Sequence, residues 1–295
     1  MRGLNDSAAG IFKEFARQKD DLKWYAIADS AQHAQLPEAL VEDLFEKRCL
    51  LGSTPGSPLA KKSPHLVQLK SPIHESKAWR WLRLNSRVSP CVSIIATHKT
   101  FDDAFKQFQN CTEVSLSDGE IMCFAFWDPA ILGSLVGQHD DHTLHIKGPV
   151  LSREQRSVLM QGLVAWWYWD REGVLHVINL NEDMSVPVNN TIKLNQHQVD
   201  DLIEASVPDH ILYYLSLNQP EIIDEIPPEK RYEAVRAALL HARNIGLLGM
   251  RDLVDFVCLH FIYKERLCND PKIAGLLNCV KSQQLSLRGV IADFP

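Results

Sequence analysis

The sequence predicts an α+β fold, with a mixed sheet and helices in an N-terminal lobe and an all-helical C-terminal lobe. In the first part of the chain, apolar runs typical of buried strands alternate with apolar residues at helical spacing. Beyond the polar connector at 186–192, strand-like runs are scarce and the apolar residues recur at helical spacing only. We therefore expect two lobes, residues 1–190 and 191–295.

The first half of the N-terminal lobe is expected to alternate helices with strands. Branched and aromatic residues indicate the strands, and apolar residues that share one helical face indicate the helices. A stretch rich in Gly, Ser and Pro at 52–63 predicts an exposed loop. The predicted strands are 22–28, 66–69 and 91–96, and the predicted helices are 8–16, 40–45, 75–84 and 101–108.

A β-hairpin is predicted next. Strand-like runs at 112–116 and 120–127 flank Ser117, Asp118 and Gly119. An Asp-Gly pair supplies the positive φ angles that a tight antiparallel turn requires, so these two runs should pair with one another.

A capped helix should follow the hairpin. Asp128 matches an N-cap, because a carboxylate there accepts hydrogen bonds from the unpaired N–H groups of the first helical turn. Pro129 matches the first helical position, because proline has no N–H to leave unpaired, and the helix should continue through Val136. Farther along, the patterns predict a strand at 143–146, a helix at 153–168 and a strand at 174–180.

The C-terminal lobe is expected to hold four helices. Apolar residues repeat at helical spacing in four segments, and proline or glycine residues separate these segments. The segments are 199–203, 211–215, 232–242 and 253–261, and the separating residues are Pro208, Pro227, Pro228 and Gly249.

Composition and charge narrow the classes of function. Hydrophobic residues make up 45% and charged residues 23% of the chain, as in ordinary globular proteins. A net charge of -6 with scattered cations does not provide the basic surface that nucleic acids require. The N-terminal 20 residues lack the apolar region of a signal peptide, and no apolar run is long enough to span a membrane. The seven cysteines include no Cys-x-x-Cys pair, which fits a reducing compartment. We expect a cytoplasmic protein that binds no nucleic acid and has no membrane span.

Motifs of nucleotide and hydrolase chemistry are missing from the sequence. The chain contains no Gly-x-Gly-x-x-Gly, no phosphate-binding loop and no Gly-x-Ser-x-Gly nucleophile elbow. A partial zinc-protease motif begins at His74 and Glu75, but Ala78 stands where the second histidine ligand is needed. We therefore expect no enzymatic activity and no cofactor.

One cluster has the chemistry of metal ligands. It combines imidazole and carboxylate side chains within seven residues. Helical zinc motifs place histidines four residues apart, whereas this cluster lies in a loop that enters a predicted strand, so we expect a solvated turn and no metal. A metal-dependent hydrolase that uses His139, His142 and His145 is the alternative. The cluster consists of His139, Asp140, Asp141, His142 and His145.

Four tryptophans are candidates for contact with a partner protein. Large amphipathic rings are common in interface hot spots as well as in cores. Trp166 and Trp167 are consecutive and cannot face the same way, so at least one should face solvent, another element or a partner. With Trp79 and Trp81, they form the expected partner-binding set; core packing is the alternative interpretation.

Several motifs resemble those of a family of bacterial secretion adaptors. Tyr25, Ala26 and Asp29 match the family's Tyr-Ala-x-x-Asp strand, and 64–69 matches its Pro-x-Leu-Val-x-Leu segment. The hairpin and capped helix resemble its Phe-Arg-Phe-Tyr-Asp-Pro run, except that Ala125 replaces the Arg. The matching residues there are Asp118, Gly119, Phe124, Phe126, Trp127, Asp128 and Pro129, with Trp127 replacing the commoner Tyr. Farther along, the residues that resemble the family's helical C-terminal region are Ala242, Gly246, Phe256, Asp270 and Pro271.

Over most of its length the chain thus resembles the type VI secretion system effector adaptor (chaperone) family, catalogued in part as domain of unknown function 4123. The resemblance implies a cytosolic protein that binds one cognate secreted effector and helps load it onto the valine-glycine-repeat spike protein (VgrG), without catalysing a reaction. We expect the two lobes to form a joint concave surface for the effector. An immunity protein that blocks a toxin is a further alternative.

Overall fold

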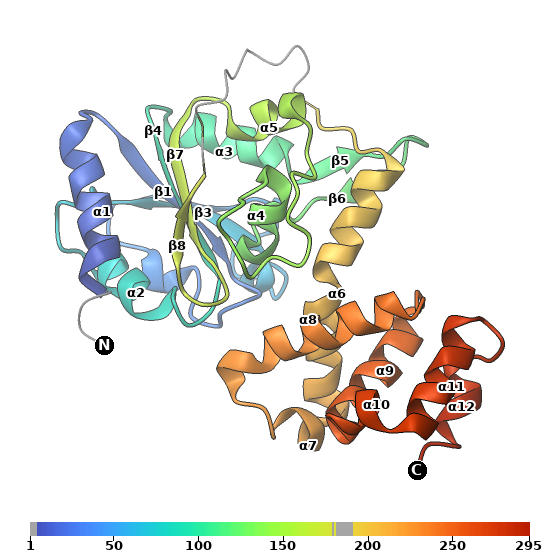
Figure 1. Cartoon of the computed structure of the whole chain (residues 1–295). Coiled ribbons are helices and arrows are strands. Elements are labelled where there is room, and N and C mark those ends of the chain that lie inside the picture. Colours follow the sequence, from blue (N-terminus) through green and yellow to red (C-terminus); the bar gives the residue numbers. More distant parts are fainter. Residues whose placement is uncertain (1–4, 179, 181–190) are drawn as a thin grey trace. The chain divides into compact units, whose positions relative to one another are not determined.

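The chain contains a mainly antiparallel α+β part followed by a helical part. The computed structural model in Figure 1 describes residues 5–178, 180 and 191–295. All strands of the central sheet precede residue 178, and helices make up the regular structure from 196 onward, which confirms the fold class that the sequence predicts. Among the described residues, none of the helices has the length and apolar character needed to cross a membrane.

The structure divides into two compact units, residues 1–205 and 206–295. The division falls inside helix α6 (Gln196–Asn218), whereas the sequence places the boundary in the connector at residue 190. Most of that connector, residues 186–190, lies outside the described residues.

A six-stranded sheet forms the centre of the N-terminal unit. Its strand order is β2-β3-β1-β4-β7-β8, and every strand pair described within it is antiparallel. The edge strands β2 and β8 have three residues each, so the longer inner strands carry most of the pairing. The strands are β1 (Lys23–Asp29), β2 (Lys47–Cys49), β3 (Pro64–Leu69), β4 (Val92–Thr97), β7 (Leu163–Trp169) and β8 (Leu175–Val177).

Helices cover both faces of this sheet (Figure 1). The α1/α2 face is covered by α1 (Asn5–Gln18) and α2 (Lys77–Asn85). The α3–α5 face is covered by α3 (Phe101–Asn110), α4 (Pro129–Val136) and α5 (Arg153–Met160). Because both faces are buried, the inner strands are apolar on both sides, which removes the alternating pattern of a half-exposed strand.

The predicted hairpin and capped helix are confirmed, although the second strand ends at Cys123 and not at Trp127. Strands β5 (Glu113–Ser115) and β6 (Ile121–Cys123) pair antiparallel around a turn in which Gly119 has a φ of 92°. The Asp128 carboxylate accepts a hydrogen bond from the Ala130 N–H at 2.9 Å, and α4 ends at Val136 as predicted. Local turn and cap chemistry was sufficient to predict these elements.

The predicted helix at 153–168 is wrong in its second half. Helix α5 ends at Met160, Gly162 adopts a φ of 70°, and the chain continues as the inner strand β7. The run from Leu163 to Trp169 is apolar throughout, and hydrophobic periodicity does not distinguish such a buried strand from a buried helix.

Three further predictions are corrected. Residues 143–146 form turns and bends instead of a strand, because Asp141 holds the start of this segment in a turn. Residues 40–45 do not form an α-helix; a 3-10 turn, η1 (Glu38–Leu40), is followed by irregular chain. A second 3-10 turn, η2 (Ala60–Lys62), interrupts the predicted loop at 52–63.

The C-terminal unit is helical, with its own apolar core around Leu239, Phe256 and Ile273. The predicted break at Pro208 is wrong, because α6 continues through this proline. Proline inside a helix costs about 3 kcal/mol, and burial of the neighbouring Val207 and Ile211 in the core offsets this cost. The other helices are α7 (Pro220–Ile223), α8 (Pro228–Asn244), α9 (Met250–Tyr263), α10 (Arg266–Asn269), α11 (Pro271–Lys281) and α12 (Leu287–Ile291).

Candidate functional site

The motif residue Tyr25 is a core residue of the α3–α5 face. It lies on β1, and its ring packs edge-on against Phe101 at 5.8 Å. Its hydroxyl donates a hydrogen bond to the Lys99 carbonyl at 2.9 Å. Burial raises the pKa of Tyr25 to about 12, so the phenol stays protonated and serves as a structural donor.

The motif carboxylates Asp29 and Asp128 influence one another, although 99 positions separate them. Asp29 is the last residue of β1 and is buried; its carboxylate accepts the Ala31 N–H at 3.1 Å. Burial, and then the negative charge of Asp128, raise the pKa of Asp29 to about 7. The last residue of β1 and the N-cap residue of α4 therefore lie close enough for their charges to interact.

The position of Ala125 differs in character from that of its neighbours. Phe124, Phe126 and Trp127 are buried, and the Trp127 ring contacts Phe126 at 5.5 Å. Ala125 is exposed, so this position of the motif lies at the surface.

Trp166 and Trp167 are buried on opposite faces of β7. Their exposed fractions are 0% and 2%, and Trp167 stacks on Trp24 at 5.6 Å. The alternation of side chains that sends them to opposite faces does not expose either, because helices cover both faces. Neither ring reaches the surface, so both leave the set of partner-binding candidates.

Trp79 and Trp81 lie on α2 and are each partly exposed. The Trp79 indole N–H donates to the Lys70 carbonyl at 2.8 Å, and its ring packs against Phe12 at 5.2 Å. The Trp81 indole N–H donates to Gln35 Oε1 at 3.0 Å. Both rings are therefore held in fixed orientations with part of their surface accessible.

Trp79 also lines a small apolar cavity of about 50 Å³ between α1 and α2. Phe12, Leu82 and Trp169 contribute apolar surface to it. Charged side chains surround this surface, and cations exceed acids among them: Lys13, Arg83 and Arg87 against Glu75. An apolar side chain next to carboxylates would match this cavity and its rim.

The histidines that the alternative metal-site interpretation requires do not come together. His139 and His142 are exposed. The His145 side chain is only 4% exposed, and its Nε2 lies 3.0 Å from Glu204 Oε1. Within the described residues, none of the three belongs to a group with metal-ligand spacing, so the hydrolase alternative lacks its ligand set.

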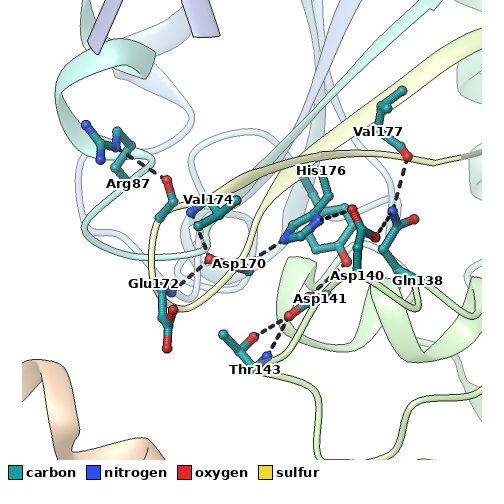
Figure 2. A network of polar contacts seen from close by, with 12 residues as sticks. Arg87, Gln138, Asp140, Asp141, Thr143, Asp170, Glu172, Val174, His176 and Val177 are labelled. Atoms are coloured by element: carbon teal, nitrogen blue, oxygen red, sulfur yellow. Dashed lines mark hydrogen bonds and ion pairs between the residues drawn. The ribbon is translucent and has the colours of Figure 1, made fainter. Parts of the chain in front are cut away.

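A different polar network lies beside the β7–β8 hairpin (Figure 2). His176 Nε2 lies 2.9 Å from Asp170 Oδ2, and His176 Nδ1 lies 3.3 Å from Asp140 Oδ2. The Tyr168 hydroxyl donates to Asp141 Oδ2 at 2.9 Å. Asp141, Asp170 and His176 are all buried, and one ligand atom from each lies within 4.8 Å of the others.

Opposing effects act on the His176 ring. Burial lowers the pKa of His176, but the hydrogen bond to Asp170 and the charges of Asp141 and Asp170 raise it, and the net shift is upward. Burial and the Asp141 carboxylate raise the pKa of Tyr168, which keeps the phenol protonated as a donor. These contacts give a buried network in which carboxylates outnumber the basic group.

Gly133 on α4 makes room for this network. A side chain there would collide with the Tyr168 hydroxyl and with Leu144. Glycine costs about 1 kcal/mol relative to alanine within a helix, so this position trades helical stability for the close approach of the phenol.

The sequence pointed to Asp140 and Asp141 but missed Asp170 and His176. The signal that could have revealed them is a hairpin at 163–177, because its register pairs Tyr168 with His176 across the two strands. Recognition of 163–177 as a hairpin would have placed Asp170 in its turn and the imidazole beside the phenol.

A model of the family described as "Domain of unknown function (DUF4123)" matches residues 24–145 of the chain. The matched segment contains Tyr25, Asp29, the β5–β6 hairpin and all of α4, whereas Asp170 and His176 lie beyond it. No significant match was found among curated proteins or solved structures.

Proposed function

We propose that this chain is a type VI secretion adaptor, a chaperone-like protein that binds a cognate effector and assists its loading onto the valine-glycine-repeat spike protein. The main support is that the DUF4123 match at 24–145 covers the segment that contains the resembling motifs from Tyr25 to Pro129. The proposed activity is binding of a polypeptide and needs no cofactor.

The core position of the motif residues favours a scaffold role for them. Tyr25 and Trp127 are buried, and Asp128 caps α4, so these residues shape the N-terminal unit. Partner contact then falls to exposed surface, and α2 offers Trp79 and Trp81 as partly exposed aromatic anchors. The cationic rim around the neighbouring cavity favours an effector segment that carries carboxylates.

The experiment is co-expression of the full chain with candidate effector and spike proteins, followed by affinity capture and size-exclusion chromatography. We expect a stable complex that contains the effector, and a spike component recruited with it. Capture of a toxin alone, with inhibition of its activity and no spike recruitment, would instead indicate an immunity protein. Absence of a complex with either component would contradict both functions.

The contact surface is tested by Trp81→Ala and Arg83→Glu. We expect each to weaken effector binding at least 10-fold, because interface aromatics and complementary charges contribute strongly. Ile121→Ala is the matched control, because Ile121 is a 64% exposed apolar residue on β6, away from α2. Equal affinity of all three variants at unchanged Tm would place the effector on another surface.

A further inference from the structure

The two buried carboxylates of the polar network each have one oxygen held by the backbone. Asp141 Oδ1 accepts the Thr143 N–H at 2.9 Å and the Thr143 hydroxyl at 2.7 Å. Asp170 Oδ1 accepts the N–H groups of Glu172 at 2.9 Å and Val174 at 2.8 Å. Two turns thus fix the orientation of both carboxylates, and the second oxygen of each faces the interior of the network (Figure 2).

The His176 ring is fixed between these groups. It stacks on Tyr168 with ring centroids 5.4 Å apart, and its Nε2 points to Asp170. Its other nitrogen, Nδ1, faces the Asp140 carboxylate at 3.3 Å. A metal-bound histidine almost always directs its free ring nitrogen to a carboxylate or carbonyl, which orients the ring and strengthens it as a ligand. Asp140 occupies that position here.

The charge of the buried groups favours a divalent cation. Asp141 and Asp170 carry two negative charges, and all three side chains of the trio are buried. A divalent cation balances the formal charge of the two carboxylates. Burial of an uncompensated charge is costly, so such a cation stabilises the three buried side chains.

We propose that Asp141, Asp170 and His176 bind a divalent first-row transition metal ion, with Zn²⁺ as the best match. One imidazole and two carboxylates suit such ions better than Mg²⁺ or Ca²⁺, which prefer oxygen ligands alone. The ligand atoms lie within 4.8 Å of one another, a spacing that a small inward shift brings to metal-ligand distances of about 2 Å. The ion joins the loop after α4 to the β7–β8 hairpin and stabilises the N-terminal unit. This site is independent of the proposed adaptor function.

The first test measures metal in the full wild-type chain. Protein purified without chelators from zinc-supplemented cells should retain stoichiometric Zn²⁺ after dialysis, as measured by inductively coupled plasma mass spectrometry. EDTA should remove the metal and lower Tm, and ZnCl₂ should restore it by about 5 to 10 °C at free Zn²⁺ about 100-fold above Kd. MgCl₂ and CaCl₂ at the same concentration should not. Loading with Co²⁺ should give the visible absorption of a coordinated ion.

Variants then identify the ligands. His176→Gln and Asp170→Asn should lose both the bound metal and the zinc-dependent rise in Tm. The double variant His139→Ala/His142→Ala should keep both, because these two exposed histidines lie in the same loop but outside the trio.

Two results would overturn the proposal. One is a dialysed wild-type chain that holds no transition metal and whose Tm responds to neither EDTA nor ZnCl₂. Hydrogen bonds alone would then stabilise the network. The other is zinc that persists in His176→Gln and disappears in the His139→Ala/His142→Ala variant, which assigns the metal to the surface histidines. The wild-type measurement decides the first point even where a variant fails to fold.

Discussion

The two faces of the six-stranded sheet are both buried, but different interactions stabilise them. On the α1/α2 face, Trp24, Trp167 and Phe12 pack ring against ring. On the α3–α5 face, apolar side chains surround hydroxyl and carboxylate groups such as Tyr168 and Asp141. One strand, β7, supplies both kinds of surface, so a single chain segment joins a packed aromatic layer to a hydrogen-bonded network.

The largest effect is expected on the aromatic face. Trp167→Ala should lower the free energy of unfolding by about 3–5 kcal/mol, because it removes a ring buried against Trp24 and leaves a cavity. Urea unfolding followed by tryptophan fluorescence measures this loss in the N-terminal unit alone, since all seven tryptophans of the chain lie there. Trp81→Ala is the control, and a loss under about 1 kcal/mol for Trp167→Ala would contradict the comparison.

Stability should depend on pH through Asp29. Alternation along β1 places this residue on the α3–α5 face with Tyr25 and Ile27. An aspartate in the unfolded chain has an ordinary pKa of 3.8, whereas burial and Asp128 raise the pKa of Asp29 in the folded chain to about 7. At pH between these two pKa values, the Asp29 carboxyl is therefore protonated in the folded chain and ionised in the unfolded chain. This contribution to stability is fully present below pH about 4 and is lost as pH rises through about 7, with a slope approaching 1.4 kcal/mol per pH unit.

Asp29→Asn should remove this part of the pH dependence, as measured by urea unfolding at pH 5, 6, 7 and 8. Asp128→Asn should reduce it, because an asparagine still caps α4 but no longer raises the pKa of Asp29. Identical slopes for Asp29→Asn and wild type would show that other groups determine the pH profile.

The smallest effect is expected from single hydroxyl groups. Tyr168→Phe should cost about 1–3 kcal/mol, because it leaves the buried Asp141 without one of its donors. Tyr25→Phe removes a bond to the neutral Lys99 carbonyl and should cost about 1 kcal/mol. The same fluorescence assay compares the free energies of unfolding of the two variants. An equal or larger loss for Tyr25→Phe would show that the hydrogen bond from the Tyr168 phenol to Asp141 contributes little to stability.

Local chemistry explains which elements could be predicted from the sequence. Asp118 and Gly119 define a turn, and Asp128 and Pro129 define a helix start, without help from distant residues. Strand β7 was not predictable in this way, because burial on both faces leaves it without an alternating pattern. The sequence left open whether Trp166 and Trp167 face solvent, another element or a partner, and the sheet buries both.

The polar network depends on contacts that sequence spacing does not show. Asp141 is in the loop that the sequence marked, but its partners Asp170 and His176 reach it only through the pairing of β7 with β8. Proximity along the chain instead indicated His139, His142 and His145 as the alternative metal ligands, and among the described residues none of the three belongs to a group with metal-ligand spacing.

The glycine of α4 has a consequence for how this protein can vary. Position 133 and the phenol of Tyr168 compete for the same volume, so the residue allowed at one site depends on the residue at the other. In any homologue that keeps this packing, a larger residue at the position of Gly133 should be accompanied by a shorter side chain at the position of Tyr168. The two sites should then vary as a pair, and the buried carboxylate beside them should lose its phenolic donor at the same time.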